Sequence, residues 1–272
     1  MTQTAIAFLL GVLQGATEFL PVSSSGHLVL VPWLFGWPAP GLAFDAVVHW
    51  GTALAVVVYF WRDWVSLVEA AFRSLVTRSL ADPQAQLAWF IVLGTVPAAL
   101  LGYLLNDFFE GMFGRPVAAA GFLLVTAALL AATEWLGRRE RDLGQLTWLD
   151  ALLVGLAQAL AILPGISRSG ATIAAGLARG LRREPAARFS FLLATPIILG
   201  AGLLQVVDLA QTGDLAAQAP ALIVGFVTAG GVGFGCIHFL MRYLQRRPLY
   251  PFAVYCAVLG SACLLVALAR GG

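Results

Sequence analysis

The chain has 272 residues, of which 60% are hydrophobic and 11% charged, with a mean hydropathy of +0.87. Soluble domains carry about 25% charged residues, so this composition excludes an ordinary soluble protein and predicts a polytopic membrane protein. The sixteen basic residues are all arginines and the net charge is only +2, which gives no reason to expect a nucleic-acid partner.

The first apolar segment is broken by a polar turn. Residues 4–20 are apolar but end at Pro21 and a run of three serines, and a short apolar stretch then continues to about residue 36. The N-terminus lacks a basic segment and a cleavage site, so we expect it to remain in the mature protein. Irregular backbone at membrane depth is tolerated only where it is buried in protein or lines a cavity. The break therefore predicts a polar site.

A second break repeats the first. Residues 148–163 end at Pro164-Gly165, and another short apolar stretch runs to about residue 178. Each pair of short helices cannot cross a hydrocarbon layer of about 30 Å twice, so we expect two re-entrant helix–turn–helix hairpins. At an offset of 144 residues and without a gap, Gly11, Gln14, Ser23, Ser25 and Gly26 align with Gly155, Gln158, Ser167, Ser169 and Gly170.

Six further segments are long and apolar enough to span a membrane, which takes about 20 residues. Residues 62–82, between the first two, are amphipathic and predict a helix that lies along the membrane surface. The six predicted spans cover residues 42–61, 85–105, 116–136, 187–207, 220–241 and 250–269.

The arginines predict the orientation of these spans. If each hairpin returns to the side from which it starts, thirteen arginines fall on one side and two, Arg115 and Arg270, on the other, while Arg168 lies in the second break. The arginine-rich side is then the cytoplasm. We then expect both termini and the opening of the site to face outward. The thirteen are Arg62, Arg73, Arg78, Arg138, Arg139, Arg141, Arg179, Arg182, Arg183, Arg188, Arg242, Arg246 and Arg247.

One hairpin and three spans make an odd number of crossings, so the second half enters the membrane with opposite polarity. The sequence predicts an all-α polytopic membrane protein with a single domain, residues 1–272, built as an inverted-topology repeat of residues 1–140 and 147–272. In such repeats the site lies near the midplane, where broken helices meet. The tips of the two hairpins can then face each other.

Gln14 and Glu18 lie four residues apart and share a helix face. A carboxylate inside a membrane is costly and marks a functional site by default. Glu18, with Gln14, can hold a divalent cation, Mg²⁺ or Ca²⁺, whose coordination shell is completed by substrate phosphates. The plainer interpretation is a protonated Glu18 that bonds to the serine turn.

The two turns offer hydroxyls, free backbone N–H groups and an arginine, which together form an anion site. Serine is also a common helix cap, but these polar residues exceed what capping needs. Arg168 suits a phosphate because its planar fork donates parallel hydrogen bonds, and it can also pair with Glu18 across the two halves. Arg168 is a candidate catalytic residue. The candidate headgroup-binding residues are Gln14, Ser23, Ser25, Ser167, Ser169 and Thr172.

Ser24 and His27 are the candidates for covalent and proton-transfer chemistry. Either side chain can attack phosphorus while the other moves the proton, although His27 without its neighbours would be structural. Asp45 and His49 lie one turn apart at the start of the first span. They either extend the site or cap the helix, and the sequence does not decide between these roles.

These residues resemble the undecaprenyl-pyrophosphate phosphatase family, which is also known for bacitracin resistance. Gln14-Gly-Ala-Thr-Glu18, followed by the serine turn and His27, matches the first family motif, and Pro164 to Thr172 matches PGxSRSxxT completely. The resemblance covers nearly the whole chain. It implies a cation-dependent inner-membrane enzyme that hydrolyses a C55 isoprenyl pyrophosphate to the monophosphate carrier reused for peptidoglycan and other envelope polymers. Gln14, where the family also accepts Glu, brings an amide oxygen and no charge.

The expected mechanism places the lipid tail between spans and the headgroup against Arg168, which stabilises the charge that builds at phosphoryl transfer. Ser24 is the preferred nucleophile and His27 the proton shuttle, while attack by His27 or by water stays open. A lipid-carrier flippase or transporter is the alternative, because inverted repeats with broken helices are transporter architecture. A non-catalytic scaffold is a third class, which the polarity around Arg168 disfavours. The oligomeric state, a homodimer included, is open.

Overall fold

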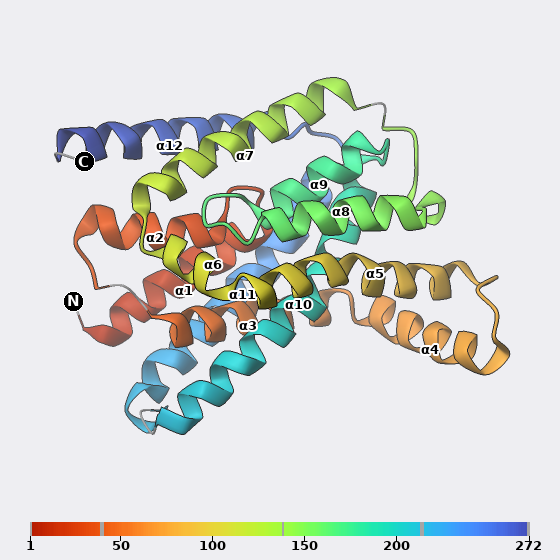
Figure 1. Cartoon of the computed structure of the whole chain (residues 1–272), viewed down its shortest axis with the longest axis horizontal. Helices are drawn as coiled ribbons and strands as arrows, with labels where there is room; N and C mark the ends of the chain where they lie inside the picture. Colours follow the sequence, from red (N-terminus) through yellow and green to blue (C-terminus); the bar gives the residue numbers. More distant parts are fainter. Residues whose placement is uncertain (1, 39–40, 138, 213–214, 271–272) are drawn as a thin grey trace.

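The computed structural model describes residues 2–38, 41–137, 139–212 and 215–270, and within these ranges the chain is built from helices (Figure 1). Its only β-type pairing there is an isolated bridge between Arg141 and Leu181. Arg138, one of the thirteen arginines counted above, lies outside the described residues. The predicted all-α class is confirmed.

Six candidate membrane spans are present, counting one bent pair as a single span. The bent pair is α3 (Leu42–Tyr59) and α4 (Trp61–Thr77), which meet at Phe60 with an angle of 80°. The predicted segments and the observed helices agree within a few residues at most ends, so the polytopic class is confirmed. The other five spans are α5 (Pro83–Leu104), α7 (Pro116–Leu136), α10 (Arg183–Thr212), α11 (Leu215–Leu244) and α12 (Tyr250–Ala269).

Four shorter helices form two broken pairs. The first pair is α1 (Gln3–Phe19) and α2 (Ser24–Phe35), and the second is α8 (Trp148–Leu160) and α9 (Arg168–Ala178). The prolines at 21 and 164 cannot donate a backbone hydrogen bond and disfavour a continuing helix. Between the spans lie α6 (Asn106–Phe113) and the short 3₁₀ helix η1 (Leu143–Gln145).

The first helix of each broken pair packs against the other half of the chain. Helix α1 packs along α11, and α8 packs along α5. Glycines allow the close approach: a Cβ on Gly11 would lie 2.8 Å from the Gly225 carbonyl oxygen, and one on Gly155 would collide with the Gly94 backbone. Small residues at helix crossings are the usual means of close packing in membranes.

The arginine-rich connections gather at one end of the bundle. Arg188 pairs with Asp63 and Arg183 with Glu134, which joins connections that are far apart in sequence, and Arg141 pairs with the nearby Asp150. Both termini lie at the opposite end, on the left of Figure 1. There Arg270 donates to the carbonyl oxygens of Trp33 and Leu34, at 3.1 and 3.0 Å.

Gly155→Ala should destabilise the protein, because the added methyl group must push α8 away from the Gly94 backbone. Overpacking of this kind costs about 1–3 kcal/mol, so we expect a lower thermal unfolding midpoint in detergent. Gly231→Ala in α11 is the matched control, since nothing lies within 4 Å of its added Cβ. An equal midpoint for the two variants would contradict the close approach of α8 to α5.

Candidate active site

The two turns are built on the same type of cap. Ser23 precedes α2, and its Oγ accepts a hydrogen bond from Gly26 N at 3.2 Å. Ser167 precedes α9, and its Oγ accepts one from Gly170 N at 3.0 Å. Such caps satisfy backbone donors that the first helical turn leaves free. Ser24 and Arg168 are the first helical residues after the caps, so the caps fix the positions of their Cα atoms.

Polar contacts lock one turn onto the other. Ser23 Oγ accepts a second hydrogen bond, from Gly165 N at 3.1 Å, and Ser169 Oγ donates to the Leu20 carbonyl at 3.2 Å. The backbones touch, because a Cβ on Gly26 would lie 3.0 Å from Gly165 Cα. Gly165 itself has a φ of 101°, a conformation that glycine adopts without strain.

The remaining hydroxyls of the second turn are also engaged. Thr126 on α7 donates to the Gly165 carbonyl at 2.9 Å and accepts from Ser167 N at 3.0 Å. Thr172 Oγ1 donates to the Arg168 carbonyl at 2.7 Å and lies 2.6 Å from Ser190 Oγ. Four of the predicted headgroup-binding residues, Ser23, Ser167, Ser169 and Thr172, therefore hold the turns together in this structure. Ser25 Oγ lies 3.4 Å from Ser23 Oγ.

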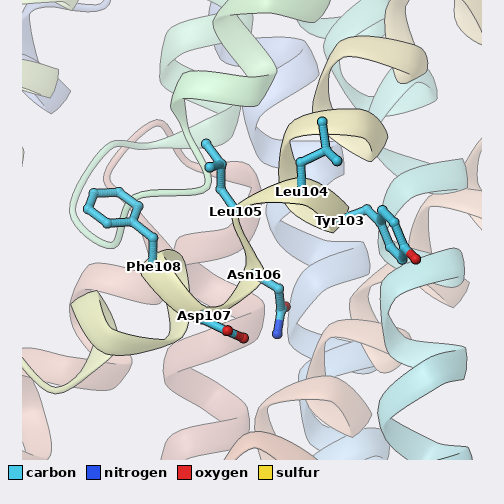
Figure 2. Close-up of a pocket in the computed structure, with 6 residues that line it drawn as sticks. All are labelled: Tyr103, Leu104, Leu105, Asn106, Asp107 and Phe108. Atoms are coloured by element: carbon cyan, nitrogen blue, oxygen red, sulfur yellow. The ribbon is translucent and has the colours of Figure 1, made fainter.

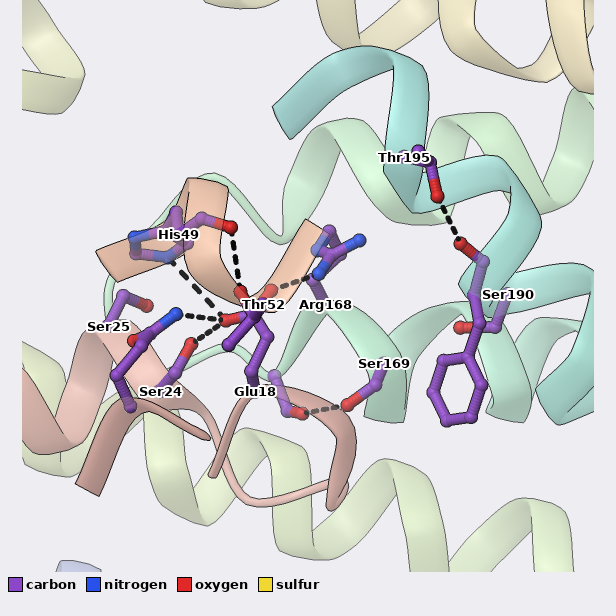
Figure 3. Close-up of polar contacts among 12 residues, drawn as sticks. Glu18, Ser24, Ser25, His49, Thr52, Arg168, Ser169, Ser190 and Thr195 are labelled. Atoms are coloured by element: carbon purple, nitrogen blue, oxygen red, sulfur yellow. Dashed lines mark hydrogen bonds and ion pairs between the residues drawn. The ribbon is translucent and has the colours of Figure 1, made fainter. Parts of the chain in front are cut away.

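Glu18 is the centre of the site (Figure 3). Its Oε1 pairs with Arg168, and its Oε2 accepts from Ser24 Oγ at 2.5 Å and from Gln14 Nε2 at 2.9 Å. The structure thus brings Gln14, Glu18, Ser24 and Arg168 together from both halves of the chain. The Glu18 side chain is only 2% exposed, against 18% for Arg168. Arg168 is therefore the more exposed partner of the ion pair.

His49 lies next to this group and also bonds within its own helix, so it shows features of both predicted roles. Its Nε2 lies 3.5 Å from Glu18 Oε2, and its Nδ1 lies 2.7 Å from the Asp45 carbonyl oxygen. The His49 carbonyl in turn accepts a hydrogen bond from Thr52 Oγ1 at 2.7 Å. Figure 3 shows the His49 ring facing Glu18 from the side opposite Arg168.

His27, in contrast, is engaged elsewhere. Its Nδ1 lies 2.7 Å from the Ser23 carbonyl oxygen and its Nε2 lies 2.7 Å from Tyr255 Oη on α12, with the two rings stacked. A carbonyl oxygen only accepts, so Nδ1 carries the hydrogen and Nε2 accepts from the Tyr255 hydroxyl. Neither nitrogen bonds to Ser24 or Glu18, and the residue ties the first turn to α12.

Three polar contacts were missed by sequence analysis: those of Thr126, Ser190 and Tyr255. Each lies in a mostly apolar span and belongs to no motif. A separate depression lies where α5 ends and α6 begins, lined by residues 103–108 (Figure 2), and contains none of the site residues. No group of three or more His, Cys, Asp or Glu side chains that could hold a metal occurs among the described residues.

Fold and site together define a multi-pass α-helical membrane protein with a buried carboxylate–arginine pair between two broken helix pairs. The model of the family "Bacitracin resistance protein BacA" matches residues 7–262, so the chain belongs to this family. The chain is 47% identical over 268 residues to an undecaprenyl-diphosphatase of Thermomicrobium roseum, with 96% of both chains covered. It is 44% identical over 263 residues to that of Desulforudis audaxviator (97% of both) and 45% identical over 252 residues to that of Nitrosococcus oceani (93% and 94%).

Tyr255→Phe should destabilise the protein, because it leaves the buried His27 Nε2 without its donor. An unsatisfied buried acceptor costs about 1–3 kcal/mol, and the thermal unfolding midpoint in detergent measures the loss. Tyr250→Phe, on the same helix and 41% exposed, is the matched control. If both variants unfold at the wild-type temperature, the His27–Tyr255 contact does not hold the turn.

Proposed function

We propose that this chain is an undecaprenyl-diphosphatase, which removes the terminal phosphate from a C55 isoprenyl pyrophosphate and releases the monophosphate lipid carrier. The relatives that bear this name cover more than nine-tenths of the chain. The observation that carries the proposal is the contact of Glu18 with both Arg168 and Ser24. It places a guanidinium group and a candidate nucleophilic hydroxyl on the same buried carboxylate.

Arg168 is assigned to the phosphoryl oxygens. Its side chain is the more exposed partner of the pair that it forms with Glu18, so an incoming headgroup meets Arg168 before the carboxylate. Bidentate contact between arginine and phosphate supplies geometry as well as charge. Catalysis of phosphoryl transfer rests largely on such positioning and charge stabilisation.

Ser24 is assigned as the nucleophile. Its hydroxyl donates to Glu18 Oε2 at 2.5 Å, so the carboxylate is placed to accept the proton as Oγ bonds to the terminal phosphorus. The bond from that phosphorus to the bridging oxygen breaks, and the lipid monophosphate leaves. Water then hydrolyses the phosphoserine and releases phosphate. His27 was predicted as the proton shuttle, but it bonds to Ser23 and Tyr255 instead. We therefore assign the removal of the Ser24 proton to Glu18.

A divalent cation fits beside Glu18. Gln14 is fully buried, and its Oε1 has no hydrogen-bond partner although its Nε2 bonds to Glu18. An orphaned amide oxygen next to a carboxylate is a donor set for a hard cation, with phosphate oxygens completing the shell. When bound, the cation would neutralise charge on the two phosphates.

We also propose that the broken pairs are re-entrant hairpins of an inverted repeat in a bacterial inner membrane. The packing of α1 and α8 against the opposite halves supports the repeat. The arginine-rich end of the bundle would face the cytoplasm by the positive-inside rule. Both termini and the opening of the site would then face the periplasm.

Purified protein in detergent should release inorganic phosphate from an isoprenyl pyrophosphate, and a chelator should stop the release. Arg168→Ala should lower turnover by roughly 10²-fold or more, as expected for losing a donor that stabilises transition-state charge. A flippase has no transport to perform in detergent and would release no phosphate. Wild-type turnover by folded Arg168→Ala would remove this residue from the site.

Ser24→Ala should abolish a covalent phosphoenzyme, because the attacking oxygen is gone. Acid-quenched wild-type protein incubated with substrate labelled at the terminal phosphate should carry label, and the variant should carry none. Ser261→Ala is the control, since Ser261 is an exposed residue of α12 outside the two turns. Turnover and label retained in Ser24→Ala would assign the attack to another group.

A further inference from the structure

A hydrogen bond to the backbone carbonyl of Asp45 orients the ring of His49. A carbonyl oxygen only accepts hydrogen bonds, so the 2.7 Å contact with Asp45 O places the ring hydrogen on Nδ1. In the neutral ring, Nε2 then carries a free lone pair. This nitrogen is the one that faces Glu18 (Figure 3). Histidine ligands of metal ions are commonly held in this way, with the second ring N–H donated to a backbone carbonyl.

The spacing between His49 and Glu18 suits a shared ion. Their Nε2 and Oε2 atoms are 3.5 Å apart, which is beyond a normal N–H···O hydrogen bond. Two ligand atoms, each about 2.1 Å from one ion, are about 3.0 Å apart at the right angle of an octahedral shell and about 3.4 Å apart at a tetrahedral angle, so only a small shift of the ring would let both atoms bind one ion. The free lone pair, its direction and the spacing therefore point to the same occupant.

A third donor lies at the same carboxylate oxygen. Gln14 Nε2 bonds to Glu18 Oε2, and a half-turn of the amide would bring the partnerless Oε1 to this position. Gln14 is fully buried, so no bulk water can satisfy that oxygen. This buried oxygen without a hydrogen-bond partner could bind a cation that enters the site.

We propose that His49 is a protein ligand of the active-site cation, together with Glu18 and Gln14. The inference rests on the proposed function for the presence of a cation, and it adds a nitrogen to a donor set that was expected to contain only oxygen. Imidazole nitrogen favours transition metals over Mg²⁺ and Ca²⁺. The site should therefore prefer an ion such as Mn²⁺ over Mg²⁺, with substrate phosphates completing the shell.

The test is Mn²⁺ binding to the purified full-length protein in detergent, followed by electron paramagnetic resonance. Bound Mn²⁺ should show a nitrogen hyperfine coupling in the wild-type protein. His49→Gln should lose that coupling and bind Mn²⁺ about 10-fold or more weakly, while Mg²⁺ affinity, measured by competition, changes less than threefold. His238→Gln is the matched control, because His238 contacts only Tyr59 among the described side chains.

Either of two spectra, that of the wild-type protein or that of His49→Gln, can overturn the inference. If Mn²⁺ binds without nitrogen coupling, or if the coupling survives in His49→Gln, His49 is not a ligand and its contact with Glu18 is an ion pair. Phosphate release with Mg²⁺ in the same preparation separates the two proposals. Release without nitrogen coupling removes only the role of His49, whereas nitrogen coupling without phosphate release under any cation removes only the phosphatase assignment.

Discussion

The ion pair between Glu18 and Arg168 is the contact on which the site depends. The two residues are 150 positions apart in sequence, and the carboxylate is almost wholly buried. Removing one partner of a buried pair leaves an uncompensated charge, at a cost of about 3–5 kcal/mol. The pair therefore joins the two halves of the chain and places every other polar group of the site relative to one carboxylate.

The repeat explains why these particular residues meet. At the 144-residue offset, the caps Ser23 and Ser167 are equivalent, and so are Ser24 and Arg168, the first residues of α2 and α9. Both of these latter residues contact Glu18, one at each carboxylate oxygen. The equivalent of Glu18 in the second half is Ile162. One carboxylate therefore receives a hydroxyl and a guanidinium from positions that are equivalent in the sequence alignment of the two turns.

The helix breaks, the six spans and the meeting of Glu18 with Arg168 could be predicted, because each depends on strong local signals. These signals are a proline before a serine turn, an apolar run of about 20 residues and a charge that needs a partner. The roles of the hydroxyls could not be separated, since serine caps a helix and binds phosphate with the same atoms. The direction of His27 depends on Tyr255, and therefore on the register of α12 against the first turn, which no local pattern encodes.

The burial of Glu18 limits how a headgroup can bind. Glu18 is 2% exposed, whereas Arg168 and His49 are 18% and 27% exposed. A diphosphate approaching from solvent therefore meets these two side chains before it meets the carboxylate or Ser24. The Glu18 carboxylate and a substrate phosphate repel each other if both bind Arg168. A second cation beside Glu18, in addition to Arg168, would remove this repulsion. His49 and Gln14, on the other side of the carboxylate, lie where that second cation would bind. Arg168 could then turn to the phosphate without leaving a buried carboxylate uncompensated.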